Sequence, residues 1–490
     1  MANQPNIVTT ATPEEDAQQR AAIDRSLRVP VLFFFTSGLV WLFISLLLGM
    51  IASMKLYLPD LFASFPFLTY GRVQPAHLNA FVYGWGFQVG LGTALWIMAR
   101  LCRISLPRIA MLITAGHLWN IGVAIGVGGI LLGYGTSIQF LDFPVGIWPL
   151  LLVSYCIIAG YIVMMFKSRR DGHVYISQWY ILAACFWFPW SYLTANLLIH
   201  HFPSAAVINT SIGGWYGGTL LMLWFVPIGL GVTYYLIPKV VGRPIYSYQL
   251  ALASFWSLAL LGGWVGVQHY MGGPLPAWMS SISGAAMIFM IVPMVFIALN
   301  YYNTMKDDIA LVNYSPTLRF VFFGVISFVV FILLGAAFSL FRFGKIFQFS
   351  HGELGYQMTG LYGFFSMIMF GAIYFIMPRL MGCEWRSGKW IRFHFWFSAY
   401  GTGAMLLSLL MAGLFQGQQA LMHADEHVLS VEVASGFLVG LSISWLLIIL
   451  SNMMFFFHVL LMICRLGRRS GEATYIHPHN TEHDLKAAQA

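Results

Sequence analysis

The chain has 490 residues, of which 59% are hydrophobic and only 9% are charged, and its formal net charge is +8 at pH 7. This composition excludes the soluble globular and the intrinsically disordered classes, which contain far more polar residues. The positive charge is therefore interpreted as a signal of membrane topology, and it gives no reason to expect nucleic acid as a partner.

Twelve apolar stretches are long enough to cross a lipid bilayer, for which a helix needs about 20 residues. They lie near 30–54, 73–99, 108–134, 144–166, 175–198, 213–237, 249–272, 279–303, 317–341, 352–378, 391–415 and 430–464. The sequence thus predicts an all-α integral membrane bundle of twelve transmembrane helices at 30–465. We expect a cytoplasmic N-terminal segment at 1–29 and a cytoplasmic tail at 466–490.

The basic residues are sorted unevenly between the connections. With twelve spans, all but four of the 25 Lys and Arg residues fall on one side of the membrane, and the exceptions are Lys55, Arg72, Arg342 and Lys345. Cytoplasmic loops are enriched in Lys and Arg, so both chain termini are predicted to face the cytoplasm. An odd number of spans would destroy this sorting, which supports the count of twelve.

The second span contains a histidine about one turn inside its outer end. His77 is surrounded by the small residues Ala76, Ala80 and Gly84. Small residues let a bulky neighbour approach a helix closely, as a haem ligand requires. The alternative interpretation is a histidine that only forms a hydrogen bond to a neighbouring helix.

Further motifs follow in the later spans. Arg72 to Ala80 has the pattern Arg-x-x-Pro-x-His-x-Asn-Ala, the turn after span six reads Gly-Arg-Pro-Ile-Tyr-Ser-Tyr, span seven ends in Trp-Val-Gly-Val-Gln-His-Tyr, and span ten opens with Ser-His-Gly-Glu-Leu-Gly-Tyr-Gln-Met. With these motifs the chain resembles subunit I of the haem–copper oxidase superfamily, and in particular its cbb3-type branch. The resemblance extends over nearly the whole chain.

The resemblance implies a position for a low-spin haem b. In the family this haem lies between a histidine of span two and a histidine of span ten, and these positions correspond to His77 and Met358. A His/Met pair, as in cytochromes c, raises the reduction potential. Arg72, Arg342 and Lys345 are candidates to pair with haem propionates, although they could equally face lipid headgroups.

The other family positions depart from the pattern. The copper ligands fall at Gly218, Gln268 and His269, the redox-active tyrosine at Gly262, and the ligand of the high-spin haem at Tyr356. Glycine has no side chain to bind a metal, and an amide oxygen is a weak ligand where copper prefers imidazole. We therefore expect no working haem–copper centre, no copper, and at most one haem b.

A second polar cluster is predicted at the outer surface, formed by His351, Glu353, His423 and His427. The last two are four residues apart, so they would share one helix face if this segment is helical. Imidazoles and carboxylates together can bind Zn²⁺ or Cu²⁺. Hydrated loop residues are the alternative interpretation.

The resemblance and its departures together predict a divergent subunit I-like protein of the bacterial cytoplasmic membrane. It would act in respiratory electron transfer through one low-spin haem, or as a structural subunit beside a second respiratory subunit such as a c-type cytochrome. An active terminal oxidase or nitric oxide reductase with unusual ligands is one alternative. A non-redox membrane scaffold or transporter is another, and whether the chain is an enzyme stays open at this point.

Overall fold

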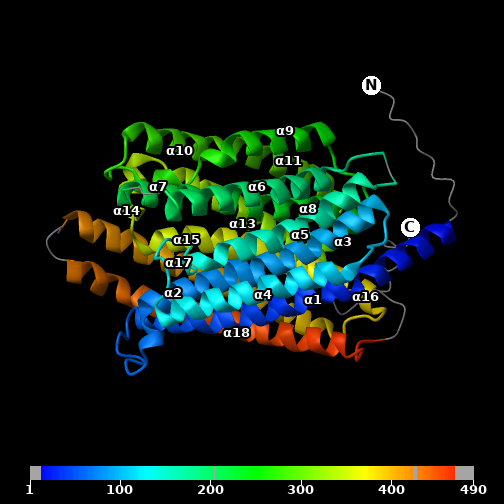
Figure 1. Ribbon diagram of the computed structural model, residues 1–490, viewed down its shortest axis with the longest axis horizontal. Helices are drawn as coiled ribbons and strands as arrows, with labels where there is room; N and C mark the ends of the chain where they lie inside the picture. Colours follow the sequence, from blue (N-terminus) through cyan, green and yellow to red (C-terminus); the bar gives the residue numbers. More distant parts are fainter. Residues whose placement is uncertain (1–12, 171, 203–204, 423–426, 469–490) are drawn as a thin grey trace.

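The computed structural model describes residues 13–170, 172–202, 205–422 and 427–468. Within these ranges the chain is helical, and its β-structure is limited to one isolated bridge between Glu384 and Arg468. The helices lie side by side along the long axis of the molecule (Figure 1). The predicted all-α class is confirmed.

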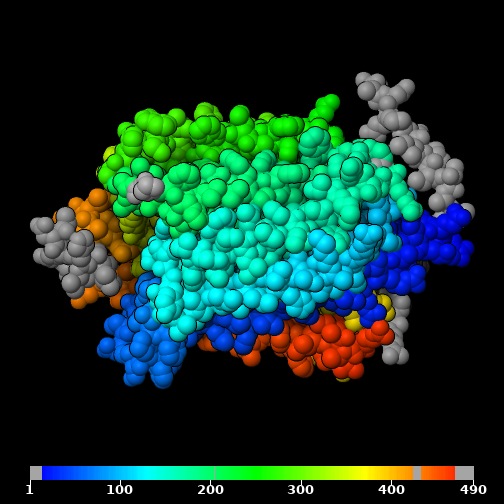
Figure 2. Space-filling model, viewed as in Figure 1, coloured from blue at the N-terminus to red at the C-terminus, as the bar shows by residue number. Residues whose placement is uncertain are grey.

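The peripheral helices cover the outside of the bundle. They are α1 (Pro13–Lys55), α4 (Ile109–Leu132), α5 (Trp148–Lys167), α6 (Ile176–His200), α9 (Tyr248–Leu261), α10 (Ala277–Phe289), α11 (Ile291–Met305), α13 (Pro316–Phe338), α17 (Gly388–Met422) and α18 (His427–Ile463). The short helices α12 (Leu311–Tyr314) and α14 (Phe341–Phe347) lie in connections. The loop between α1 and α2 projects at the end of the bundle opposite to the start of α1 (Figure 2).

Three helical runs form the interior of the bundle. They are α2 (Tyr70–Asn79), η2 (Ala80–Gly86) and α3 (Phe87–Cys102), then α7 (Ala206–Leu220), η4 (Leu221–Phe225) and α8 (Val226–Val241), and finally α15 (His351–Met358), η7 (Thr359–Ser366) and α16 (Met367–Met381). The segments η2, η4 and η7 are π-helical, a wide helical turn that is frequent at functional sites.

The helices are long and apolar enough for a membrane protein. Eleven helical segments of the described chain could cross a bilayer by their length and composition. The one remaining predicted span, the second at 73–99, is present as the run from Tyr70 to Cys102, which contains the buried polar residues His77, Asn79 and Gln88. This run is surrounded by protein, so it does not need a lipid-compatible surface.

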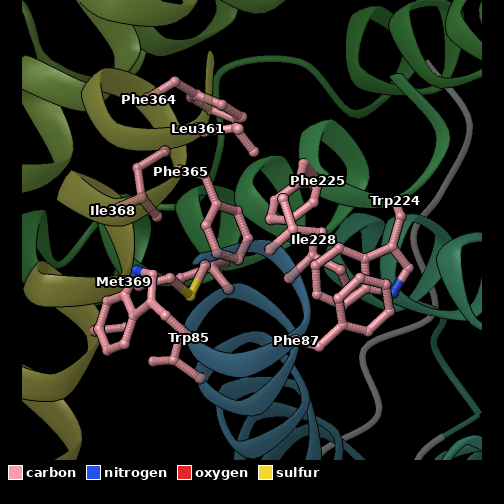
Figure 3. Close-up of a cluster of buried hydrophobic side chains, with 14 of the residues drawn as sticks. Trp85, Phe87, Trp224, Phe225, Ile228, Leu361, Phe364, Phe365, Ile368 and Met369 are labelled. Atoms are coloured by element: carbon pink, nitrogen blue, oxygen red, sulfur yellow. The ribbon is translucent and has the colours of Figure 1, made fainter. Parts of the chain in front are cut away.

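Large apolar and aromatic side chains from the three interior runs cluster together in the middle of the bundle, as Figure 3 shows. The rings of Phe87 and Trp224 are stacked with their centroids 3.7 Å apart. A Cβ atom at Gly90 would lie 2.9 Å from the Trp224 ring, and one at Gly86 would lie 2.6 Å from the Phe225 ring. The interior is thus closely packed, since any larger residue at these glycines would collide with a ring.

The predicted seventh span has an irregular outer end. Helix α9 ends at Leu261, and the 3₁₀ turns η5 (Gly262–Trp264) and η6 (Val267–Tyr270) replace the regular helix expected to continue to residue 272. Gly266 between them has a φ of 114°, a conformation that glycine adopts at little cost. Because the helix is interrupted here, the side chains of Val267 to Tyr270 point in directions different from those in a continuous helix.

Candidate functional site

His77 of α2 is buried between α1 and α18. Its Nδ1 atom lies 2.7 Å from the carbonyl oxygen of Ser45 and 3.0 Å from the Ser45 hydroxyl. A Cβ atom at Gly49 would lie 2.8 Å from the imidazole, and the ring of Trp445 meets it edge-on with centroids 5.0 Å apart. The ring is therefore held in one position by α1 and α18.

The other ring nitrogen of His77 has no hydrogen-bond partner among the described residues, although the side chain is only 1% exposed. A backbone carbonyl that accepts from Nδ1–H leaves the Nε2 lone pair available, which is the arrangement that orients a metal-binding histidine. A buried polar atom without a partner is uncommon and calls for an explanation, of which an absent ligand is one. His77 thus fits an axial haem ligand.

Met358 ends helix α15 and is also buried. Phe81 and Tyr362 follow His77 and Met358 by four residues, about one helical turn, and their rings lie 6.2 Å apart. Residues four apart share a helix face. On this basis His77 and Met358 each lie about one turn from the contact between η2 and η7.

The backbone of α7 touches the turn between η5 and η6. A Cβ atom at Gly218 would lie 2.6 Å from the Cα atom of Gly266 and closer still to the carbonyl oxygen of Val265. A Cβ atom at Gly266 would in turn collide with the carbonyl oxygen of Gly214. There is no space for an imidazole at Gly218.

The side chain of Gln268 holds the same turn together. Its Oε1 atom accepts from the backbone N–H of Gly266 at 2.6 Å and from the hydroxyl of Ser283 at 2.6 Å. Its amide nitrogen lies 3.2 Å from Nε2 of His269, whose Nδ1 lies 3.4 Å from a carboxylate oxygen of Glu353. The polar atoms at these positions are engaged with each other.

The surroundings of Gly262 and Tyr356 are filled by neighbouring side chains. A Cβ atom at Gly262 would lie 2.6 Å from the side chain of Leu223. The Tyr356 ring is stacked on Phe331 with centroids 4.7 Å apart, and its hydroxyl is 4.0 Å from the sulfur of Met287. This residue contributes an apolar surface rather than a free phenol.

A cavity of about 240 Å³ lies among these residues. The structure brings Gly218, Gln268, His269, Glu353 and Tyr356 to its wall. Pockets for drug-sized ligands typically measure about 300–1,000 Å³. The cavity is therefore suited to small molecules.

The structure describes only part of the predicted outer metal cluster. His351 begins α15 and donates its backbone N–H to Gln416 at 3.1 Å, while Glu353 faces His269, a residue that the sequence assigned to another site. His423 lies outside the described residues, and His427 is described only as the start of α18. Among the described residues no group of three or more His, Cys, Asp or Glu is placed to bind a metal, so the cluster stays a prediction.

The candidate propionate partners lie in different surroundings. Arg72 donates from its guanidinium to the carbonyl oxygen of Leu131 at 3.2 Å. Arg342 and Lys345 are exposed on α14. Their role at a haem stays a prediction.

One buried polar pair was not found by sequence reasoning. Asn79 donates to a carboxylate oxygen of Asp142 at 2.6 Å, and Asp142 is only 4% exposed. Burial raises the pKa of Asp142 to about 6, although the hydrogen bond from Asn79 opposes this shift. Asp142 lies in a loop without a recognisable motif. The one sequence feature that could have drawn attention to the pair is the polar residue Asn79, two positions after His77 in the same span.

The helical spans around three closely packed interior runs define a polytopic membrane protein with the architecture of an oxidase subunit I. A chain of a haem–copper terminal oxidase dimer solved by cryo-EM has the same fold, with a TM-score of 0.72 over 94% of this chain and 89% of that chain at 11% identity. The model of the family described as cytochrome c and quinol oxidase polypeptide I matches residues 29–447, and the chain belongs to this family.

Relatives with similar sequences are subunits of bacterial oxidases. The chain is 24% identical to the cbb3-type cytochrome c oxidase subunit CcoN1 of Stutzerimonas stutzeri, over 78% of this chain and 82% of the relative. It is 25% identical to a cytochrome c oxidase subunit 1 homologue of Agrobacterium tumefaciens, over 78% of this chain and 72% of the relative. The resemblance inferred from the sequence motifs is confirmed.

Proposed function

We propose that this chain is a divergent cbb3-type subunit I-like membrane protein that does not reduce dioxygen. It transfers electrons through a single low-spin haem b held by His77 and Met358. The observation that carries this proposal is the backbone contact at Gly218, where a side chain would meet Val265 and Gly266.

The residues at the copper positions do not fit a copper ion. Gly218 offers neither a ligand nor space for one, and the oxygen of Gln268 already accepts two hydrogen bonds. Only His269 remains as an imidazole there, and one imidazole cannot hold copper alone. The related possibility of a terminal oxidase or nitric oxide reductase with unusual ligands would require ligands from elsewhere in the chain.

The residues at the low-spin position do fit a haem. Among the described residues the Nε2 atom of His77 has no hydrogen-bond partner, its Nδ1 is fixed by Ser45, and Met358 is buried at the end of α15. A bound haem would supply one-electron transfer, and the surrounding apolar side chains would set its potential. Thioether ligation by Met358 would raise that potential.

A structural role is the second candidate function. The interior aromatic side chains pack against glycines and against one another, and this packing favours a bundle that is stable without a large ligand. In that case the chain would serve as a scaffold for another subunit. The two functions differ in whether the purified protein contains a haem.

The proposal includes a location and a partner. The relatives are named as oxidase subunits, which supports a bacterial cytoplasmic membrane and a second respiratory subunit such as a c-type cytochrome. The sorting of Lys and Arg supports cytoplasmic termini. We retain the division into a segment at 1–29, the membrane domain at 30–465 and a tail at 466–490.

Absorption spectroscopy of the purified protein tests the proposal. We expect a reduced-minus-oxidised spectrum of low-spin haem b that carbon monoxide does not change, and no bound copper by elemental analysis. A haem that binds carbon monoxide together with one copper per chain would overturn the proposal. A spectrum without haem bands would leave the structural role.

Two variants locate the haem. His77→Ala should abolish the low-spin bands, whereas His117→Ala should leave them unchanged, because His117 bonds to the carbonyl of Ile113 on an exposed face. Met358→His should lower the midpoint potential, since a second imidazole replaces the thioether. An unchanged midpoint would exclude Met358 as the axial ligand.

A further inference from the structure

A strongly basic hollow opens at the end of the bundle where α1 begins. Two adjoining cavities of about 520 and 1210 Å³ share Asp16, Arg20 and Arg100 in their walls. Together their linings contain seven Lys and Arg side chains but only two carboxylates, Asp16 and Asp24. We call these two cavities the basic basin. Its net charge attracts anions.

Some of these basic side chains are neutralised within the protein. Asp24 pairs with Arg100 at 3.1 Å, and Asp16 pairs with Arg20 and with Arg103. Among the described residues no salt bridge reaches the other basic side chains of the basin, which are Arg25, Arg28, Arg379 and Lys239. An excess of positive charge therefore faces the cavity.

The ends of the interior helices partly account for this charge. Arg100, Lys239 and Arg379 lie in the last turns of α3, α8 and α16, where positive side chains interact favourably with the helix C-termini. Arg25 and Arg28 lie on α1, which runs past the ends of its neighbours (Figure 1). Their charge is not required by a helix end, because α1 continues to Lys55.

The basin lies at the end of the bundle that is predicted to face the cytoplasm. Its walls combine the ends of the interior helices α3, α8 and α16 with residues of α1 and with the starts of α6 and α9. A soluble anion can reach it from the cytoplasm, and the comparison of two nanodisc compositions below distinguishes such an anion from a lipid headgroup.

Aromatic rings line the larger cavity beside the cations. Tyr246 is 62% exposed, and the ring of His173 lies 4.7 Å from Tyr175 and 5.8 Å from Tyr248. Exposed rings next to cationic side chains can stack on a base while the cations pair with phosphates. This combination is selective for a phosphate ester with an aromatic group.

From this arrangement we infer that the basic basin binds a soluble nucleoside polyphosphate. Lys239 pairs with the phosphates, and Tyr246 stacks on the base. The inference uses no residue of the haem position, so it stands or fails independently of the proposed function.

Calorimetric titration of the full-length protein in zwitterionic phosphatidylcholine nanodiscs tests the inference. We expect saturable binding of ATP at one site per chain and weaker binding of tripolyphosphate, which has no base. Lys239→Gln should weaken both ligands about tenfold, because a hydrogen bond to a charged group is lost. Tyr246→Ser should weaken ATP about fivefold or more and leave tripolyphosphate unchanged.

Matched controls decide between the possible outcomes. Lys389→Gln, at an exposed lysine at the start of α17 that does not line the basin, should leave ATP binding unchanged. Equal losses for Lys239→Gln and Lys389→Gln, or no ATP binding at all, would overturn the inference. Loss of ATP binding in nanodiscs with anionic phosphatidylglycerol would also overturn it, because a lipid headgroup would then be the occupant.

Discussion

The Nδ1 atom of His77 lies 2.7 Å from the carbonyl oxygen of Ser45, so α1 determines the orientation of an imidazole that α2 carries. The ring has its position because Gly49, one turn further along α1, presents no side chain. The proposed haem position thus depends on four helices, α1, α2, α15 and α18. Its integrity can be tested from α1 alone.

Gly49→Ala should displace the His77 ring. A Cβ atom there would lie 2.8 Å from the imidazole, and overpacking of this kind costs about 1–3 kcal/mol. We expect a lower melting temperature and a loss of the low-spin haem bands. Gly160→Ala on α5, where nothing lies within 4 Å of the added atom, is the control and should retain both. Equal behaviour of the two variants would contradict the prediction.

Gly218→His should not restore a copper site. The new side chain would collide with the backbone at Val265 and Gly266, which cannot move like a flexible side chain, and the cost should be about 3 kcal/mol or more. Thermal denaturation and copper content measure the outcome. Gly217→Ala is the matched neighbour, because its Cβ atom would be at an ordinary distance of 3.4 Å from Phe140. A stable, copper-loaded Gly218→His protein would refute the argument.

Gln268→Ala should destabilise the turn between η5 and η6. The change leaves the buried N–H of Gly266 without its partner, which costs about 1–3 kcal/mol. Thermal denaturation should show a clear loss for this variant and almost none for Gln139→Ala, whose side chain pairs with Gln357 at the surface. If both variants melt alike, the Gln268 side chain does not hold the turn.

Asp142 should make the protein less stable as the pH rises from about 4 to about 6. Its pKa in the folded protein is raised to about 6 by burial, so the folded state binds the proton more tightly than the unfolded chain. A shift of this size corresponds to about 3 kcal/mol, lost progressively across that pH window. Stability should then level off above pH 6.

Asp142→Asn should remove this pH dependence, because an amide does not titrate and can still accept from Asn79. Melting temperatures between pH 4 and pH 7 measure the effect. Asp60→Asn, at an exposed acid in the loop after α1, should retain the slope of the original protein. A slope that persists in Asp142→Asn would assign the effect to another group.

The membrane architecture could be predicted because its signals are local. Each span has its own apolar stretch. The number of Lys and Arg residues in each connection indicates on which side of the membrane that connection lies. The run from Tyr70 to Cys102 is the instructive case, since it does not meet the hydropathy threshold of the other spans and yet is buried from Ala76 to Ala99. Its apolar stretch at 73–99 was still long enough to identify it.

The details of the candidate site could not be predicted because they depend on contacts between distant segments. The break after Leu261 is stabilised by Gln268 and by Ser283 on α10, which no local pattern connects. His269 and Glu353 were assigned to different clusters, although they face one another at 3.4 Å. The π-helical turns of the interior runs likewise have no distinct signature in a single sequence.

The backbone contact between α7 and Gly266 also limits which single substitutions the fold can accept. An imidazole at Gly218 would lower the stability of the protein before it could bind any metal. A metal site at this position would need several coordinated substitutions and a rebuilt turn. The contact therefore favours uses of the scaffold that leave this position without a metal.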